Sequence, residues 1–449
     1  MSALQLKALD KKQKRYAVTF NEFGGMGSAT GTKRLLALES INCDCRDGAL
    51  SVGFGVEVYK KDLTYVPSKT GAVRFFIVDA AERLDSSPKT VLFCLTESGG
   101  LYRFDEEIGG FVFELTVSPY SQMVCVAEET GKKVWIVSRN QAYYAYADGA
   151  WKYFGLANAT PNMCVCKDRV FLALEKATVV YSDPAATYDF RGGNIHLAYD
   201  FGEIVGMLCF KNQVYVLHQF GVARIDVKGD AEQFEIQPLD YVGGEIYGTS
   251  ALVCGEAIFF LAADGVYRFD GTRFERVEGV GRIVPKASEK FCQVSFFDGH
   301  YLLQYTAADG LRRAVAIAAD GKSGYAISER EGLSYSGGAA LFQSSGYVWT
   351  FRGDGEFTST EKGRFTTQRT DFGVQGRKTL RAVHVRGRGL VDVRIGTDGL
   401  EKEYALAFKH GVASVDLRAL GESFYFSFAL GKGARMQEVS VEFSVAKGG

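Results

Sequence analysis

Proline and helix-forming patterns are both scarce in this sequence. Only 7 of its 449 residues are proline, and no helical periodicity extends beyond the first turns of Leu4–Arg15. Because proline cannot donate the backbone hydrogen bond that a paired strand needs, its scarcity suits a chain of paired strands. Phe (33), Tyr (23) and Gly (52) are abundant, and these residues favour strands and tight turns. The composition therefore predicts an all-β protein.

The sequence also lacks the marks of membrane insertion and secretion. No stretch reaches the roughly 18 uninterrupted apolar residues that a membrane span needs, and residues 1–15 contain no continuous apolar core of a secretory signal. The nine cysteines are odd in number and most lie in apolar runs, which is typical of buried thiols in a reducing compartment. We therefore expect a protein made in a cytoplasm, with no membrane span.

The net charge of the chain is only −1, but the charged residues are unevenly distributed along it. Residues 374–449 carry 12 Lys+Arg against 8 Asp+Glu, and residues 1–15 are also basic, so the intervening body is mildly acidic. This balance argues against bulk electrostatic binding of nucleic acid.

No catalytic, cofactor or metal motif is complete. In the Gly-rich stretch 24–33, Gly31 is followed by Thr32 rather than Lys and no helix follows, so a plain loop is favoured over a phosphate-binding loop. The five histidines (196, 218, 300, 384 and 410) are scattered one at a time, and His218 and His384, which lie within strand patterns, are interpreted as structural. A Ser–His–Asp triad from distant segments stays open, without a Gly-x-Ser-x-Gly elbow to support it. The pairs at 43/45 and 164/166 lack the usual zinc-knuckle spacing and are interpreted as core thiols. We expect no cofactor.

The segment Ala262–Phe274 gives the clearest view of the local structure. Asp264-Gly265 separates the apolar runs Ala257–Leu261 and Val266–Phe269, and a second Asp-Gly pair follows at 270. Asp-Gly is the preferred pair of a type I′ hairpin turn, in which both central residues have φ > 0. The segment therefore predicts three short antiparallel strands joined by two tight turns.

Similar units recur along the chain. Each unit has an apolar strand, then an anchor residue, then an alternating strand, with one more strand upstream. The anchors are Gly100, Gln141, Ala177, Gly221, Gly265, Gly310 and Gly355, at intervals of 36–45 residues. Four short strands in such a period are typical of a β-propeller blade. We predict a propeller of about seven four-stranded blades, with six or eight as alternatives.

Three regions follow from this pattern. Residues 1–34 are predicted to be a basic arm and a Gly-rich loop, and residues 35–373 the propeller, closed by an N-terminal hairpin over 35–59. Residues 374–449 contain longer, strictly alternating strands, such as Val439–Val445, and are predicted to form a C-terminal β-sandwich.

One charge cluster is a candidate contact site for a partner. It consists of Arg377, Lys378, Arg381, Arg386 and Arg388, just after the expected domain boundary. Cationic side chains there could meet phosphates or an acidic partner. The alternative, which we favour, is that they guard a strand edge against sheet-to-sheet association.

Other acidic residues could indicate a ligand site. The nine Asp-Gly pairs could hold calcium or glycan, but turn chemistry explains them without a ligand. Carboxylates such as Asp105, Glu106, Glu107, Asp354 and Glu356 could serve a glycan-binding protein or a glycoside-active enzyme at the channel mouth, although no feature of the sequence pairs them.

Two short segments resemble a known family. Asn42–Leu50, ending at Gly53-Phe54-Gly55, resembles the opening hairpin of the nozzle (tubular) and packaged-DNA-stabilisation proteins of short-tailed phages, and Gly376–Val383 with Gly387-Arg388-Gly389 resembles the strand that enters their C-terminal β domain. The resemblance implies a non-enzymatic virion component of the phage tail, assembled in the bacterial host cytoplasm. Copies would form a ring below the portal and adaptor and let double-stranded DNA pass without sequence recognition. A host adhesin within a phage tail is a further alternative.

Overall fold

The structure is a computed structural model. It describes the chain except residues 1–6, 11–13, 25, 27–33, 60–70, 81–88, 147–149, 154–155, 157, 176, 191–192, 198, 229–233, 279, 281–282, 328–330, 353–361 and 446–449. Within the described residues every element is a strand except one 3₁₀ turn, Tyr199–Phe201, so the all-β prediction is confirmed. No helix in this part of the chain is long and apolar enough to span a membrane.

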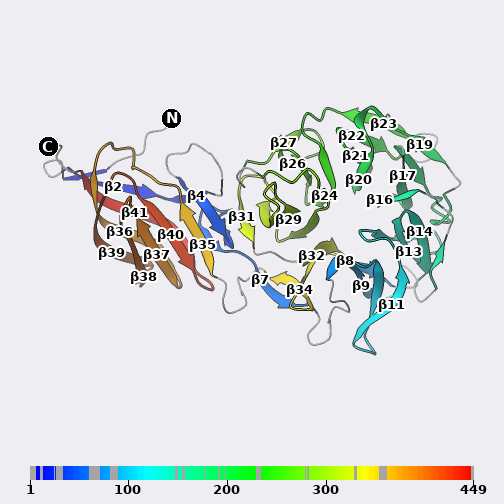
Figure 1. The fold of residues 1–449 in the computed structure, drawn as a ribbon, viewed down its shortest axis with the longest axis horizontal. Coiled ribbons are helices and arrows are strands. Elements are labelled where there is room, and N and C mark those ends of the chain that lie inside the picture. The colour runs from blue at the N-terminus through cyan, green and yellow to red at the C-terminus, as the bar shows by residue number, and fades with distance from the viewer. Residues whose placement is uncertain are drawn as a thin grey trace.

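Five consecutive four-stranded antiparallel sheets form most of one body of the molecule (Figure 1). In each sheet the strands follow in chain order, and each strand pairs antiparallel with the next one along the chain. The first three sheets contain β8 (Ala72–Asp79), β9 (Thr90–Thr96), β10 (Gly100–Asp105) and β11 (Gly110–Thr116); β12 (Gln122–Ala127), β13 (Lys133–Arg139), β14 (Gln141–Tyr146) and β15 (Lys152–Tyr153); and β16 (Ala159–Cys166), β17 (Arg169–Leu174), β18 (Thr178–Tyr181) and β19 (Asn194–His196). The next two contain β20 (Ile204–Phe210), β21 (Gln213–His218), β22 (Val222–Asp226) and β23 (Glu235–Leu239); and β24 (Ile246–Cys254), β25 (Ala257–Ala262), β26 (Gly265–Phe269) and β27 (Phe274–Arg276).

Two further four-stranded units complete a ring of seven. The sixth contains β28 (Gln293–Phe297), β29 (His300–Thr306), β30 (Arg312–Ala318) and β31 (Gly324–Ile327). The seventh contains β32 (Glu331–Ser336), β33 (Ala339–Ser344), β34 (Tyr347–Arg352) and, from the beginning of the chain, β7 (Gly55–Val58). Because Val56 and Glu57 pair with Phe351 and Thr350, the last blade is closed by a strand from near the N-terminus.

Apolar contacts between neighbouring blades hold this propeller together. Seven separate clusters of buried side chains each join two consecutive blades, and one of them joins the seventh blade to the first through Leu341, Val348 and Phe75. Middle strands are buried on both faces, and every residue of β25 and β29 is buried. A four-stranded blade cannot cover both of its faces alone, so the array must close on itself.

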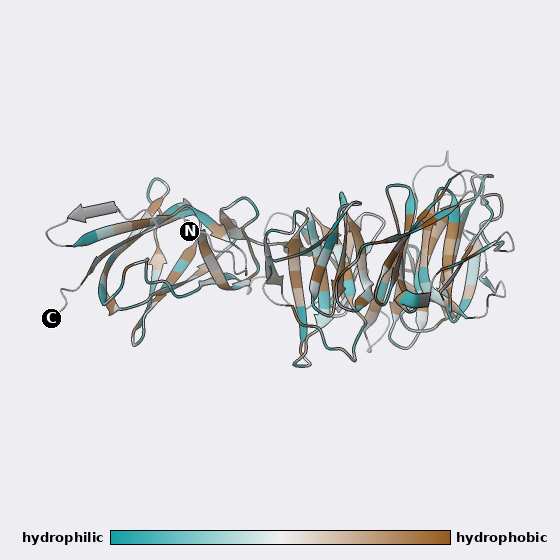
Figure 2. Cartoon of the chain, turned by 90° about the horizontal axis from the view of Figure 1, so that it is seen from above, coloured by the Kyte–Doolittle hydropathy of each residue, from teal (hydrophilic) through white to brown (hydrophobic). Residues whose placement is uncertain are grey.

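The remaining strands form two sheets beside the propeller (Figures 1 and 2). One sheet contains β1 (Lys7–Asp10), β2 (Arg15–Phe20), β41 (Arg435–Val445), β36 (Lys378–Arg388) and β39 (Val412–Gly421). In addition, β6 (Leu50–Val52) pairs with β41, and β5 (Cys43–Asp44) pairs with β6. The other contains β38 (Glu401–Leu406), β37 (Val391–Gly396), β40 (Tyr425–Leu430), β35 (Gly363–Thr367), β4 (Arg34–Ile41) and β3 (Glu22–Gly24). Phe20, Phe365, Phe428 and Phe443 belong to one hydrophobic cluster that both sheets share.

The expected region boundaries differ from this pairing. Strands lie within 1–34, where we expected an arm and a loop, and Gly27–Lys33 lie outside the described residues. Strand β4 pairs with β35, and only its last residue, Ile41, bridges to the propeller at Ala326. Residues 35–59 are therefore not one hairpin of the propeller, although Gly55–Val58 closes the last blade as expected. Strand β35 enters the second body before residue 374. The reason is tertiary: Leu35 and Phe365 bury their side chains in the cluster that the two sheets share.

The turns also differ in detail from the expectation. The two-residue loop after β25 is Ala263-Asp264, since Ala262 pairs with Gly265, and neither loop residue has positive φ. The second Asp-Gly lies in a four-residue loop between Phe269 and Phe274. The anchor expected at Gly355 lies outside the described residues, and the third strand of the seventh blade is the earlier β34.

Candidate functional site in the central channel

The structure separates the five residues of the predicted basic cluster. Strand β36 pairs with β39 on one side and β41 on the other, so it is not a sheet edge and the edge-guard interpretation is wrong. Lys378 is completely buried, and its Nζ donates to the carbonyl oxygens of Gly376 (2.7 Å) and Glu422 (2.9 Å). Burial lowers the pKa of Lys378. Lys378 therefore has a structural role, because its ammonium group already donates to two acceptors.

The other members of the cluster lie apart from Lys378. Arg377 is exposed before the strand, and Arg381 donates from Nε to Ser444 Oγ at 3.1 Å. Arg386 and Arg388 are exposed at the far end of β36, beside a shallow cavity of 520 Å³ that Arg435 also lines. The five residues thus do not form one contact surface.

The described acidic turn residues act within their own turns. Asp105 Oδ1 accepts the backbone N–H groups of Glu107 (2.9 Å) and Ile108 (3.0 Å). Asp270 Oδ1 accepts those of Thr272 and Arg273, and hydrogen bonding with Thr272 and Arg273 lowers the pKa of Asp270 to about 2. These contacts agree with the turn interpretation. Asp354 and Glu356 lie outside the described residues.

The cysteines and two of the histidines have structural surroundings. Cys43 and Cys45 belong to the core of the two-sheet body, and Cys164 and Cys166 lie in the cluster between the third and fourth blades. Among the described residues no group of His, Cys, Asp and Glu is arranged to hold a metal ion. His218 is buried with Nδ1 2.9 Å from the Gly202 carbonyl oxygen, and His384 Nδ1 is 2.8 Å from Ser414 Oγ.

A cavity of 180 Å³ lies where the seven blades meet. The innermost strand of every blade contributes to it: β8, β12, β16, β20, β24, β28 and β32. Two of these strands approach closely at glycines, since a Cβ on Gly248 would lie 1.7 Å from the Val205 carbonyl oxygen. The channel is therefore narrow, and its volume is below the roughly 300–1,000 Å³ of pockets for drug-sized ligands.

Most of the polar groups in this channel already have partners. Ser334 Oγ accepts the backbone N–H of Phe75 at 3.1 Å, and Ser336 Oγ accepts that of Ile77 at 2.8 Å. These hydroxyls join the seventh blade to the first, where no backbone ladder connects β32 with β8. They are parts of the scaffold rather than free ligand groups.

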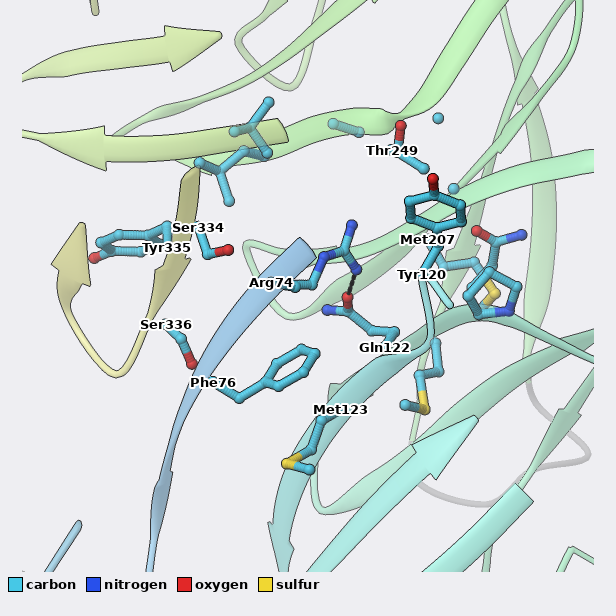
Figure 3. A pocket seen from close by; sticks show the side chains of 18 of the residues that line it. Arg74, Phe76, Tyr120, Gln122, Met123, Met207, Thr249, Ser334, Tyr335 and Ser336 are labelled. Atoms are coloured by element: carbon cyan, nitrogen blue, oxygen red, sulfur yellow. Dashed lines mark hydrogen bonds between the residues drawn. The ribbon is translucent and has the colours of Figure 1, made fainter. Parts of the chain in front are cut away.

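Two arginines differ from the rest of the lining. Arg74 and Arg139 are its only charged residues among those described, and neither forms an ion pair with a described carboxylate. Arg74 Nη1 donates to Gln122 Oε1, and both side chains project into the space between the inner strands (Figure 3). Burial, together with the nearby charge of Arg139, lowers the pKa of Arg74 to about 10.

Each of the two guanidinium groups contacts an aromatic ring rather than a carboxylate. The Arg74 guanidinium lies 5.9 Å from the ring centroid of Phe291, and that of Arg139 lies 5.5 Å from the ring centroid of Tyr120. The two rings are in contact, with centroids 4.1 Å apart. Contact of a cation with an aromatic face stabilises the cation without neutralising it. The channel thus keeps two positive charges.

Sequence reasoning missed this arginine pair. The available signal was a single charged residue, Arg74, inside the apolar run Val73–Val78. Arg139 lies 65 positions along the chain, at the end of β13, and only the closure of the ring brings it near.

The chain is similar to solved structures only. No protein-family model and no curated protein matches the sequence. Solved structures that are similar include a mitotic checkpoint complex (9% identity, 66% of this chain, 97% of that chain, TM-score 0.40) and U3-55K (9% identity, 66% and 99%, 0.43). Another is the β-propeller domain of Myceliophteria thermophila Cps50 (Swd1) (10% identity, 64% and 99%, 0.43). The propeller assignment rests on the strand pairing of this chain.

Proposed function

We propose that this chain is a non-enzymatic structural protein of a phage or prophage tail, a nozzle or DNA-stabilisation component that assembles as a ring below the portal and adaptor. In this proposal the strands beside the propeller form a β-sandwich, which is one rigid half of a two-part subunit. The partners are copies of the same chain, the portal or adaptor, other tail proteins and passing double-stranded DNA. The protein would be located in the virion tail after assembly in the bacterial host cytoplasm.

The observation that carries the proposal is the latch between the two bodies. We use this name for the hairpin Cys43–Val52 and its polar contacts. Arg46 Nε is 2.9 Å from Asp44 Oδ2, and Arg46 Nη2 is 3.0 Å from Asp298 Oδ2 in the turn between β28 and β29. On the opposite side Asp47 pairs with Arg435 of β41. The latch therefore links the sixth blade to the two-sheet body, and this fixed link supports the proposal of a virion subunit that keeps its shape under strain.

The latch also contains one of the two segments on which the family resemblance rests, since Asn42–Leu50 overlaps it. Immediately after it, the chain continues into β7, which closes the seventh blade. The same short stretch thus fixes the propeller ring and the neighbouring body. This arrangement supports a scaffold whose two parts keep a fixed orientation.

In this proposal DNA passes through the ring of subunits and not through the propeller. The propeller channel of 180 Å³ is far too small for a duplex, and side chains from all seven blades fill its surroundings. DNA passage therefore requires several copies around a common axis, which makes the oligomeric state the decisive property.

The alternative is a propeller that binds or cleaves glycans at the channel mouth. Glycoside hydrolysis uses a pair of carboxylates beside the scissile bond, and no Asp or Glu occurs among the described residues of the channel lining. Asp105, one of the candidate carboxylates, instead closes its own turn. These observations favour the structural proposal.

The test is assembly. Size-exclusion chromatography with light scattering, followed by negative-stain imaging, should show a ring, or a monomer that forms a ring when the portal or adaptor encoded near it is added. A stable monomer that does not assemble with these proteins and that turns over members of a glycan panel would refute the proposal.

A further inference from the structure

We propose that the mouth of the propeller channel is a binding site for a small phosphate-type oxyanion, held between Arg74 and Arg139. This inference is independent of ring assembly. It starts from charge: the described lining of the channel contains two guanidinium groups and no carboxylate, lysine or histidine.

Both guanidinium groups line the same cavity of 180 Å³, so their charges act within one small space. Each guanidinium rests on one ring of the contacting pair Tyr120 and Phe291, at 5.5 and 5.9 Å from the ring centroids. The charge of Arg139 is close enough to Arg74 to disfavour its charged form. Two like charges in a narrow space repel each other, and a shared anion would remove this repulsion.

The positions of the donors also fit an anion. Arginine presents five N–H donors in a planar fork. Among the described residues Arg74 forms one hydrogen bond, from Nη1 to Gln122 Oε1. Arg74 lines the cavity, and its other N–H groups are therefore the donors that we assign to the anion. Gln122 accepts through Oε1, which orients the guanidinium and leaves the amide Nε2 as a further donor (Figure 3).

Size and charge together select the ligand class. The 180 Å³ cavity admits a phosphate group but not a duplex or a folded domain. A phosphate monoester carries about −1.5 to −2 charges at pH 7, which matches two guanidinium groups better than a single carboxylate does. Guanidinium forks also bind phosphate oxygens in bidentate pairs. Free phosphate and a terminal phosphate monoester share this chemistry.

The experiment is a titration of the full chain with sodium phosphate, compared with sodium chloride at equal ionic strength. Phosphate should raise the melting temperature, and calorimetry should give saturable one-site binding. Arg74→Gln and Arg139→Gln should each weaken binding at least tenfold. The control is Arg394→Gln, because Arg394 is an exposed partner of Glu403 outside the propeller (3.2 Å), and this variant should bind as the wild type does.

Further arms separate the possible outcomes. O-phosphoserine should compete with phosphate if a monoester is accepted, and failure to compete assigns the site to the free ion. A duplex oligonucleotide should not compete, and competition by the duplex would overturn the assignment to a small anion. If phosphate does not change the melting temperature of the wild type, the proposed site is wrong. The same conclusion follows if both channel variants respond to phosphate as the wild type does. If Arg74→Gln does not fold, the half-exposed Arg139 still provides the test.

Discussion

Replacing Asp44 by Asn tests whether the latch holds the propeller closed. Asp44 is 8% exposed, and its carboxylate accepts hydrogen bonds from Arg46 Nε (2.9 Å) and the Arg46 backbone N–H (3.0 Å). His300 Nε2 lies 3.6 Å from Asp44 Oδ1. The substitution keeps the shape of the side chain and removes its charge, while the Arg46 guanidinium keeps its contact with Asp298.

The expected cost follows from the exposure of the partners. Removing one member of a fully buried ion pair costs about 3–5 kcal/mol, but the Arg46 side chain is 38% exposed. A hydrogen bond to a charged group contributes about 1.5–3 kcal/mol, and we expect a loss in this range. If the latch keeps β7 on β34, this loss makes local opening roughly 10- to 150-fold more frequent.

Hydrogen exchange with mass spectrometry measures this opening directly. Peptides covering β7 and β34 should exchange faster in Asp44→Asn by that factor, while peptides of the third blade should not change. The matched control is Asp398→Asn, because the Asp398–Arg369 pair is exposed and such pairs contribute about 0–1 kcal/mol. Unchanged exchange in β7 of a folded Asp44→Asn protein would refute the reasoning.

The same latch should depend on pH. Burial raises the pKa of Asp44, but His300 and Arg46 outweigh burial, so the net pKa lies below its usual value. The stabilisation is therefore present above the unfolded pKa of about 3.9 and is lost as pH falls through the lower folded pKa. Exchange in β7 should accelerate at this acidic end in the wild type, after correction for intrinsic exchange, and Asp44→Asn should not show this step.

Two other positions give independent predictions. Gly248→Ala should destabilise the propeller by at least the ~1–3 kcal/mol of typical overpacking, because the new Cβ would lie 1.7 Å from the Val205 carbonyl oxygen. The control is Gly110→Ala, whose Cβ would meet no atom within 4 Å. Urea denaturation should show almost no change in the stability of this control. Cys209 should be the first thiol alkylated in the native protein, because a hydrogen bond from a neighbouring thiol lowers its pKa. Cys125 is similarly half-exposed, but burial raises its pKa to about 11. Peptide mapping after brief alkylation checks the order, and earlier labelling of Cys125 would contradict it.

The sequence by itself determined the strands and their repetition. Alternating apolar residues and frequent turn residues specify short paired strands, since these patterns act between neighbours along the chain. The upstream strand expected in each unit occurs as an inner strand of a blade, for example β8, β12 and β28. Alternation in the later strands also predicted which side chains are buried. Val391 and Val393 are buried, and Asp392 between them is half-exposed.

Only the tertiary structure decided which distant strands meet. Strand β4 joins β35 and leaves the propeller because its apolar residues bury against Phe365, more than 300 positions away, and local pattern carries no information about that partner. The same limit explains the candidate sites. The basic residues 377–388 are adjacent in sequence but are divided between core and surface by their two pairing strands, whereas Arg74 and Arg139 meet because seven blades close around one channel. Burial and charge at a site are properties of the assembled ring, and the linear order of residues does not contain them.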